Sequence, residues 1–127
     1  MRNVAITTDK SLIGLIQNIA KQSSCEFDLY EKFLDPLDVM SFVCTNSPRV
    51  LLVDDDCLKP NTVHIMQSIK KVKKDIKIVF FTSNDGIELG REVLSVGVYY
   101  YAIKPITASE ISDLIKSIKK IHNQSIN

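Results

Sequence analysis

Short runs rich in β-branched and aromatic residues alternate along this chain with segments whose apolar residues recur at helical spacing. The run at 50–53 (Val-Leu-Leu-Val) is continuous and apolar, which is typical of a strand covered on both faces in a parallel sheet. We expect the other strands at 4–6, near 27–29, at 76–81 and at 98–103, each followed by a helix. The predicted fold is therefore α/β: a flavodoxin-like, doubly wound, five-stranded parallel sheet in the order 2-1-3-4-5, with five helices.

Capping residues mark where several of these helices begin and end. Asp9 is placed to cap the first helix, and Asp35 followed by Pro36 predicts the start of the second. Gly97 is expected to end a helix over 87–96. Thr107 and Glu110 have the spacing of a capping box for the last helix.

Length and composition limit the classes of protein that this chain can belong to. Its 127 residues predict one domain over 1–122, followed by a polar, frayed tail at 123–127. A net charge of +1, from 16 basic and 15 acidic residues, argues against a nucleic-acid-binding domain. The three cysteines have no metal-binding or disulfide spacing, and Cys25 and Cys44 are expected to be small buried residues. With no apolar run near the roughly 18 residues of a membrane span and no signal-peptide pattern, we expect a soluble, cytoplasmic protein without membrane contact.

Polar residues follow the ends of four predicted strands. In doubly wound sheets, ligands bind beyond the carboxyl ends of the strands, at the point where the winding direction reverses. That rule selects Thr7-Thr8-Asp9, Asp54-Asp55-Asp56, Thr82-Ser83 and Lys104-Pro105. The predicted site therefore contains carboxylates, hydroxyl groups and one ammonium group.

Three segments give the chain a resemblance to a known family. PRVLLVDDD (48–56), IVFFTSND (78–85) and GVYYYAIKPI (97–106) resemble the third-, fourth- and fifth-strand motifs of response regulator receiver domains, the CheY-like superfamily. The resemblance extends over essentially the whole chain. It implies a signalling protein of a two-component phosphorelay rather than an enzyme. Such a domain accepts a phosphoryl group from a histidine kinase or phosphotransfer protein, binds Mg²⁺, and switches a surface that contacts a downstream effector protein.

The resemblance also implies roles for individual residues. Asp54 matches the phosphoryl acceptor and a metal ligand, and Asp56 matches the residue whose backbone carbonyl reaches the metal. Lys104 matches the lysine that pairs with the acceptor and then with the phosphoryl group. Two further residues match the switch: Thr82, whose hydroxyl binds the phosphoryl group, and Tyr101, whose ring turns inward in the active state.

Plainer interpretations stand beside these roles. A run of three aspartates also suits a turn, above all for Asp55, and Tyr101 could equally be a core residue. The Lys104-Pro105 bond could simply end a strand, whereas the family resemblance implies a cis peptide at Pro105. His64 and His122 are expected at the surface, without partners that would make either one a ligand or a base.

The chain departs from the family pattern where the metal would bind. Thr7 and Thr8 stand in place of the usual acidic pair, and Asp9 follows one residue later. A shift in register would let Asp9 serve as a ligand, although the helical stripe that follows favours Asp9 as a cap. Because Mg²⁺ is usually bound through carboxylates, weak or absent Mg²⁺ binding is expected. After Asp54, the usual proline and glycine are replaced by Leu58 and Thr62, which predicts an unusual loop path.

Three functional hypotheses follow. The first is a receiver that is phosphorylated on Asp54 and presents a switched surface formed by 87–96, 98–103 and the last helix, to an effector or in a homodimer. The second is a pseudo-receiver, a protein-interaction module that uses the same surface without phosphorylation. The third, a flavodoxin-like enzyme or cofactor binder, has little support because no glycine-rich phosphate loop follows the first strand.

Overall fold

A single parallel sheet organises the chain in the computed structural model, which describes residues 2–32 and 35–126. The strands are β1 (Asn3–Ile6), β2 (Asp28–Tyr30), β3 (Val50–Asp54), β4 (Lys77–Thr82) and β5 (Tyr100–Ile103). They are all parallel and lie in the order β2-β1-β3-β4-β5, which confirms the predicted topology. The chain has the flavodoxin-like fold.

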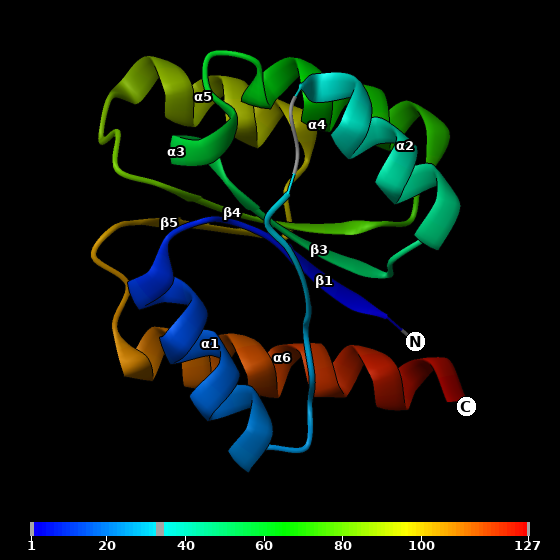
Figure 1. The fold of residues 1–127 in the computed structure, drawn as a ribbon, viewed down its shortest axis with the longest axis vertical. Helices are drawn as coiled ribbons and strands as arrows, with labels where there is room; N and C mark the ends of the chain where they lie inside the picture. Colours follow the sequence, from blue (N-terminus) through cyan, green and yellow to red (C-terminus); the bar gives the residue numbers. More distant parts are fainter. Residues whose placement is uncertain (1, 33–34, 127) are drawn as a thin grey trace.

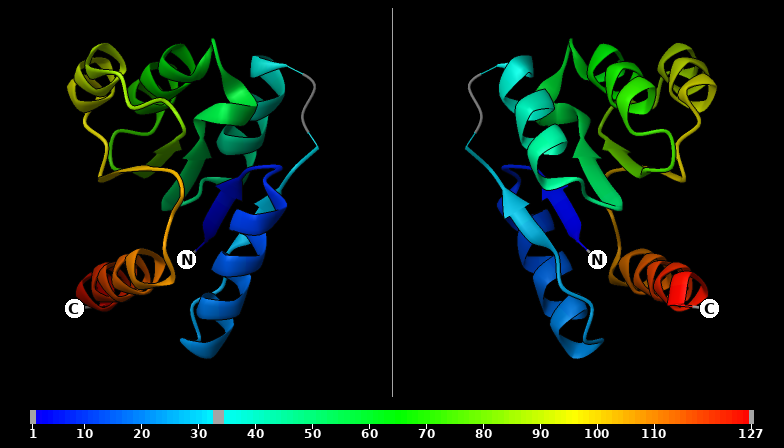
Figure 2. Two further views of the ribbon diagram at one scale, coloured as in Figure 1. Left: turned by 90° about the vertical axis from the view of Figure 1, so that its left-hand side faces the viewer. Right: turned by 90° about the vertical axis from the view of Figure 1, so that its right-hand side faces the viewer.

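Helices cover both faces of this sheet. They are α1 (Lys10–Gln22), α2 (Pro36–Asn46), α3 (Asp55–Leu58), α4 (Thr62–Val72), α5 (Ile87–Val96) and α6 (Ala108–Ile126). Figure 1 shows α1 and α6 below the sheet and α2, α4 and α5 above it, and the side views in Figure 2 show the same two layers. The short helix α3 was not predicted; with it, the described residues form six helices in place of the expected five.

Alternating side chains of the central strands fill two separate cores. On β3, Leu51 and Val53 join the core between the sheet and helices α2, α4 and α5. Leu52 joins the core between the sheet and helices α1 and α6. Phe80 and Phe81 of β4 divide in the same way, and both are fully buried. Burial on both faces explains why these strands are continuously apolar in the sequence.

The predicted caps direct the chain into its helices. The Asp9 side chain accepts a hydrogen bond of 3.2 Å from the backbone N–H of Leu12, at the start of α1. Asp35 forms a capping box with Asp38, and the hydroxyl of Thr107 accepts a 3.1 Å bond from the N–H of Glu110. The Asp9 cap also has a consequence for the site, because it holds a carboxylate beside the carboxyl end of β1.

Other sequence expectations are corrected by the structure. Cys25 is buried as predicted, but Cys44 is exposed, because α2 turns Val39 and Val43 toward the core instead. His122 was expected at the surface, but it is half-buried. Its Nε2 atom lies 3.1 Å from Asn3 Oδ1.

The end of the chain continues the last helix. The backbone of α6 is helical through Ile126, within the segment that the sequence predicted as a tail. Among the helices over the described residues, none is both long and apolar enough to cross a membrane.

Replacing Gly97 by alanine should destabilise the domain. Gly97 ends α5 with φ at 89°, in the left-handed region, and apart from the two adjacent residues no described atom lies within 4 Å of an added Cβ. The expected loss of about 1–2 kcal/mol therefore comes from backbone strain alone. Gly14→Ala is the matched control, because Gly14 lies inside α1 with equally open space and should gain about 0.5–1 kcal/mol. Urea unfolding checks both values, and similar effects from the two substitutions would contradict this account.

Candidate functional site

The carboxyl ends of β1, β3, β4 and β5 bring distant polar residues together. In the strand register Ile6 lies opposite Val53, Asp54 opposite Phe81, and Thr82 opposite Ile103. Lys104 follows immediately, and its backbone N–H donates a 2.7 Å hydrogen bond to the carbonyl of Thr82. Figure 1 shows the start of α1 and the short helix α3 at this same end of the sheet.

Lys104 lies at the centre of this site. Its Nζ atom is 2.9 Å from Asp9 Oδ2, 2.9 Å from Asp54 Oδ2 and 3.1 Å from Asp56 Oδ2. The Lys104 side chain is 13% exposed, so these ion pairs are largely shielded from water. The peptide bond between Lys104 and Pro105 is cis, as the family resemblance implied.

This arrangement shifts the pKa values of the groups around the ammonium. Burial on its own lowers the pKa of Lys104, but hydrogen bonds to Asp9 and Asp54 outweigh it, so that the pKa lies well above its usual value. The hydrogen bond from Lys104 lowers the pKa of Asp9. Burial raises the pKa of Asp56, but bonds from Ser83 and Lys104 exceed this effect and leave it lowered. These pKa shifts keep Lys104, Asp9 and Asp56 charged at neutral pH.

Asp54 is fully buried, and both of its carboxylate oxygens are engaged. Oδ2 accepts a 2.6 Å hydrogen bond from the Thr7 hydroxyl as well as the bond from Lys104, and the Cys57 thiol lies 3.5 Å away. Oδ1 accepts a 3.1 Å bond from the N–H of Asp56. Thr7 thus donates to the residue predicted as acceptor, at a position where the family carries an acid. The structure brings Asp54, Lys104 and Asp9 together.

The Thr82 hydroxyl bonds to a different aspartate. It donates a 2.7 Å hydrogen bond to Asp55 Oδ2, and the Thr62 hydroxyl donates a 2.6 Å bond to Asp55 Oδ1. All three of these residues are buried. The sequence suggested a turn role for Asp55 and placed Thr82 with Asp54. In the structure, Asp55 instead links the end of β4 to the start of α4.

Ser83 and Asp56 form a third pair at the exposed rim of the site. The Ser83 hydroxyl donates a 2.6 Å bond to Asp56 Oδ2, and its N–H donates a 3.3 Å bond to Oδ1. The sequence placed Ser83 at the site without giving it a role, and it assigned Asp56 only through its backbone carbonyl. The sequence signal for this pair was the position of each residue at the end of a strand. Ser83 comes one residue after Thr82, and Asp56 comes two residues after Asp54.

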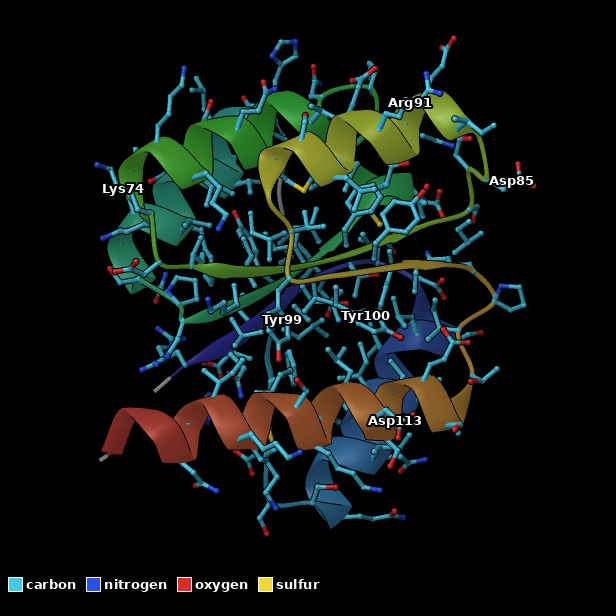
Figure 3. The ribbon with its side chains drawn as sticks, turned by 180° about the vertical axis from the view of Figure 1, so that it is seen from behind. Lys74, Asp85, Arg91, Tyr99, Tyr100 and Asp113 are labelled. Carbon is cyan, nitrogen blue, oxygen red and sulfur yellow. The ribbon has the colours of Figure 1, made fainter. Side chains whose placement is uncertain are left out.

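Tyr101 lies on the opposite side of β5 from its neighbour Tyr100. Its ring stacks on Phe80 at a centroid distance of 5.4 Å, within the core beneath α5. Tyr100 packs in the other core, and Tyr99 bonds to Ser117 of α6. Figure 3 shows Tyr99 and Tyr100 between β5 and α6. The predicted switch residue is therefore packed inward.

The donor groups of the site do not fit a resident Mg²⁺. This ion requires nearly octahedral oxygen coordination, usually with one or two carboxylates and retained waters. Here the carboxylates of Asp9, Asp54 and Asp56 converge on an ammonium group. Within residues 2–32 and 35–126, no three His, Cys, Asp or Glu side chains are arranged to hold a metal ion. The carboxylates of Asp9 and Asp54, which the sequence offered as metal ligands, bond to Lys104 instead.

A cleft of about 480 Å³ opens beside Lys104. Asp9, Ser83 and Lys104 line its polar end, and Leu12 and Ile106 contribute to an apolar wall. Because Asp9 and Lys104 line this cleft, a second molecule in it would lie beside the carboxylates that contact Lys104.

Comparisons with known proteins agree with the fold. No family model matches the chain. A curated relative from Clostridium acetobutylicum, a protein-glutamate methylesterase/protein-glutamine glutaminase, is 28% identical over 130 residues, which cover 98% of this chain and 38% of the relative. The chain therefore spans well under half the length of that protein.

Solved structures of receiver domains superpose on most of the chain. A CheY-like receiver domain protein from Methanospirillum hungatei has a TM-score of 0.76 and 15% identity, covering 97% of this chain and 94% of its own. A Francisella response regulator receiver domain has a TM-score of 0.76 and 16% identity, with 95% and 98% covered. An orphan response regulator of H. pylori has a TM-score of 0.72 and 18% identity, with 94% of each chain covered. The chain has the fold of CheY-like receiver domains.

The ion pair between Asp9 and Lys104 should make the stability of the domain depend on pH. Asp9→Asn keeps an oxygen that caps α1 but removes the charge. Because the folded-state pKa of Asp9 lies below the usual 3.8, the unfolded chain takes up this proton first as the pH falls. The stability advantage of the wild type over Asp9→Asn should therefore be largest near neutral pH and shrink as the pH drops through 3.8. Urea unfolding at a series of pH values checks this, and a gap that stays constant would contradict it.

Removing either of the two threonine hydroxyls that donate to Asp55 should destabilise the fold. Thr62→Val and Thr82→Val keep the side-chain shape but leave an oxygen of a buried carboxylate without its donor, at an expected loss of about 1–3 kcal/mol each. Thr8→Val is the control: Thr8 is exposed, and within residues 2–32 and 35–126 its hydroxyl bonds only to the Cys57 sulfur, so its effect should stay within about 0.5 kcal/mol. Denaturant unfolding measures all three, and equal effects would count against the Asp55 network.

Proposed function

We propose that this chain is a receiver module of two-component signal transduction, a signalling domain rather than an enzyme. The observation that carries this proposal is the 2.9 Å contact between Lys104 Nζ and Asp54 Oδ2, at the carboxyl end of β3. An aspartate paired with a lysine at the switch point of this fold is suited to accept a phosphoryl group, since phosphoryl transfer depends mainly on positioning and charge stabilisation.

In this proposal Asp54 accepts the phosphoryl group from a histidine kinase or a phosphotransfer protein. A carboxylate oxygen of Asp54 forms a bond to phosphorus while the P–N bond of phosphohistidine breaks, and the departing imidazole takes a proton from solvent. Lys104 balances charge on the acceptor before transfer and on the phosphoryl oxygens afterwards. The cleft beside Lys104 supplies the approach for the donor.

Access to Asp54 requires local rearrangement. Its carboxylate is 0% exposed, and the Thr7 hydroxyl occupies Oδ2 together with Lys104. The Thr82 hydroxyl would also have to leave Asp55 in order to reach a phosphoryl group on Asp54. Phosphorylation is thus coupled to a change in packing at the ends of β3 and β4.

The surface whose shape responds to this change in packing is formed by α5, β5 and α6. Ile87 and Leu94 of α5 are exposed, as are Tyr99 and Ile103 on or beside β5. Exposed apolar residues of this kind suit contact with a downstream effector or with a second copy of the chain. Tyr101 connects this surface to the core, because its ring stacks on Phe80 and its hydroxyl lies near Gly90 of α5.

The second candidate function is a pseudo-receiver that uses this surface without phosphorylation. It is favoured by the complete burial of Asp54 and by the bond that holds Thr82 on Asp55. In this mode the polar network at the site is a structural element, and binding of a partner depends on the packing that the network already maintains.

Treatment with acetyl phosphate distinguishes the two modes. Phosphorylation on Asp54 predicts that the wild type gains the mass of one phosphoryl group, that Asp54→Asn does not, and that Asp56→Asn still does. Beryllofluoride should then shift the NMR signals of Tyr101, because the switch surface repacks.

Each other result has a definite meaning. No added mass and no beryllofluoride shift, in a protein whose spectrum shows it folded, would support the pseudo-receiver. Modification of Asp54→Asn but not of Asp56→Asn would exclude Asp54 as the acceptor.

A further inference from the structure

We infer that the ammonium group of Lys104 takes the place of the divalent cation in this chain, so that the site is complete without metal. This inference depends on the receiver-type site proposed above but not on phosphoryl transfer. It rests on how the hydrogen-bonding capacity of the cluster is used.

The ammonium group has as many donors as it has carboxylate partners. A lysine ammonium carries three N–H donors. Lys104 donates hydrogen bonds of 2.9 Å to Asp9 and to Asp54, and it forms an ion pair of 3.1 Å with Asp56. The cation is therefore held from three sides by side chains that come from the start of α1, the end of β3 and the start of α3.

Each carboxylate oxygen of the cluster also has a donor from the protein. Asp9 Oδ1 accepts from Leu12, and Asp54 Oδ1 accepts from the N–H of Asp56. Asp56 Oδ1 accepts from the N–H of Ser83. The three Oδ2 atoms all contact Lys104. A metal ion that bound a carboxylate oxygen here would have to share it with one of these donors.

The threonine at the end of β1 supports the same arrangement. A carboxylate in place of Thr7 would lie against buried Asp54 and add a like charge, whereas the hydroxyl donates to Asp54 at 2.6 Å. Without a further carboxylate at residue 7, the three carboxylates of the cluster all contact one cation that belongs to the chain itself. A divalent ion at the same centre would repel that ammonium at close range.

Metal titration of the wild type and of a lysine variant tests this inference. With MgCl₂ as the ligand, the wild type should show no saturable change in the amide NMR signals of residues 7–9 and 54–57 at millimolar concentration. Lys104→Met removes the ammonium and leaves three carboxylates facing each other, so Mg²⁺ should bind at least about tenfold more tightly and raise the melting temperature. MnCl₂ should broaden the same signals in the variant only.

Two further variants make the result specific. Lys59→Met is the matched control, because Lys59 is 63% exposed and lies 3.9 Å from Asp56, outside the centre of the cluster; it should remain insensitive to Mg²⁺. If Lys104→Met does not fold, Lys104→Gln keeps amide donors without the charge and should respond to Mg²⁺ in the same way.

Two outcomes would overturn the inference. One is a saturable Mg²⁺ response of the wild type at these residues, and the other is a folded, neutral Lys104 variant that gains no Mg²⁺ binding. Since the readout is metal binding alone, a protein that fails to take up a phosphoryl group leaves this result unchanged.

Discussion

The contact between the Lys104 ammonium and the Asp54 carboxylate is the interaction on which the rest of the site depends. Asp54 ends the central strand and is fully buried, and a charge in that position is costly unless it is paired and hydrogen-bonded. The sheet brings the partner from 50 residues away. Without Lys104, the buried carboxylate would lose its counter-charge, and Asp9 and Asp56 would repel each other and Asp54.

Three consecutive aspartates serve three different purposes in this arrangement. Asp54 pairs with Lys104 and Thr7 at the centre, and Asp55 ties Thr82 to Thr62 in the interior. Asp56 faces the rim with Ser83. The turn from β3 into α3 separates their directions, so an apparently redundant run of acids links β1, β4, β5 and α4 through distinct hydrogen bonds. A network of this kind couples the ends of several elements to one another.

The comparison with receiver structures gives this network its context. The chain shares their fold with TM-scores above 0.7, yet sequence identity in these superpositions is 18% or lower, so the fold itself does not carry their chemistry. Asp54, Lys104 and Pro105 match the receiver-domain pattern that the sequence resembles, whereas Thr7 and Thr8 depart from it. The functional proposals above therefore rest on the contacts that these particular residues make.

The sequence alone determined several helix ends, because caps such as Asp9, Asp35 and Gly97 act over a few neighbouring residues. The alternation of strands and helices predicted the strand order, since doubly wound sheets of five strands commonly have the order 2-1-3-4-5. It also placed Asp54, Thr82 and Lys104 at one edge, since the carboxyl ends of parallel strands must meet there. Only the tertiary structure decided which aspartate each hydroxyl contacts, how Asp55 became buried, and that Lys104 is shared by three carboxylates. Those pairings depend on how the chain turns after β3 and on distances between residues up to 95 positions apart, which no local pattern records.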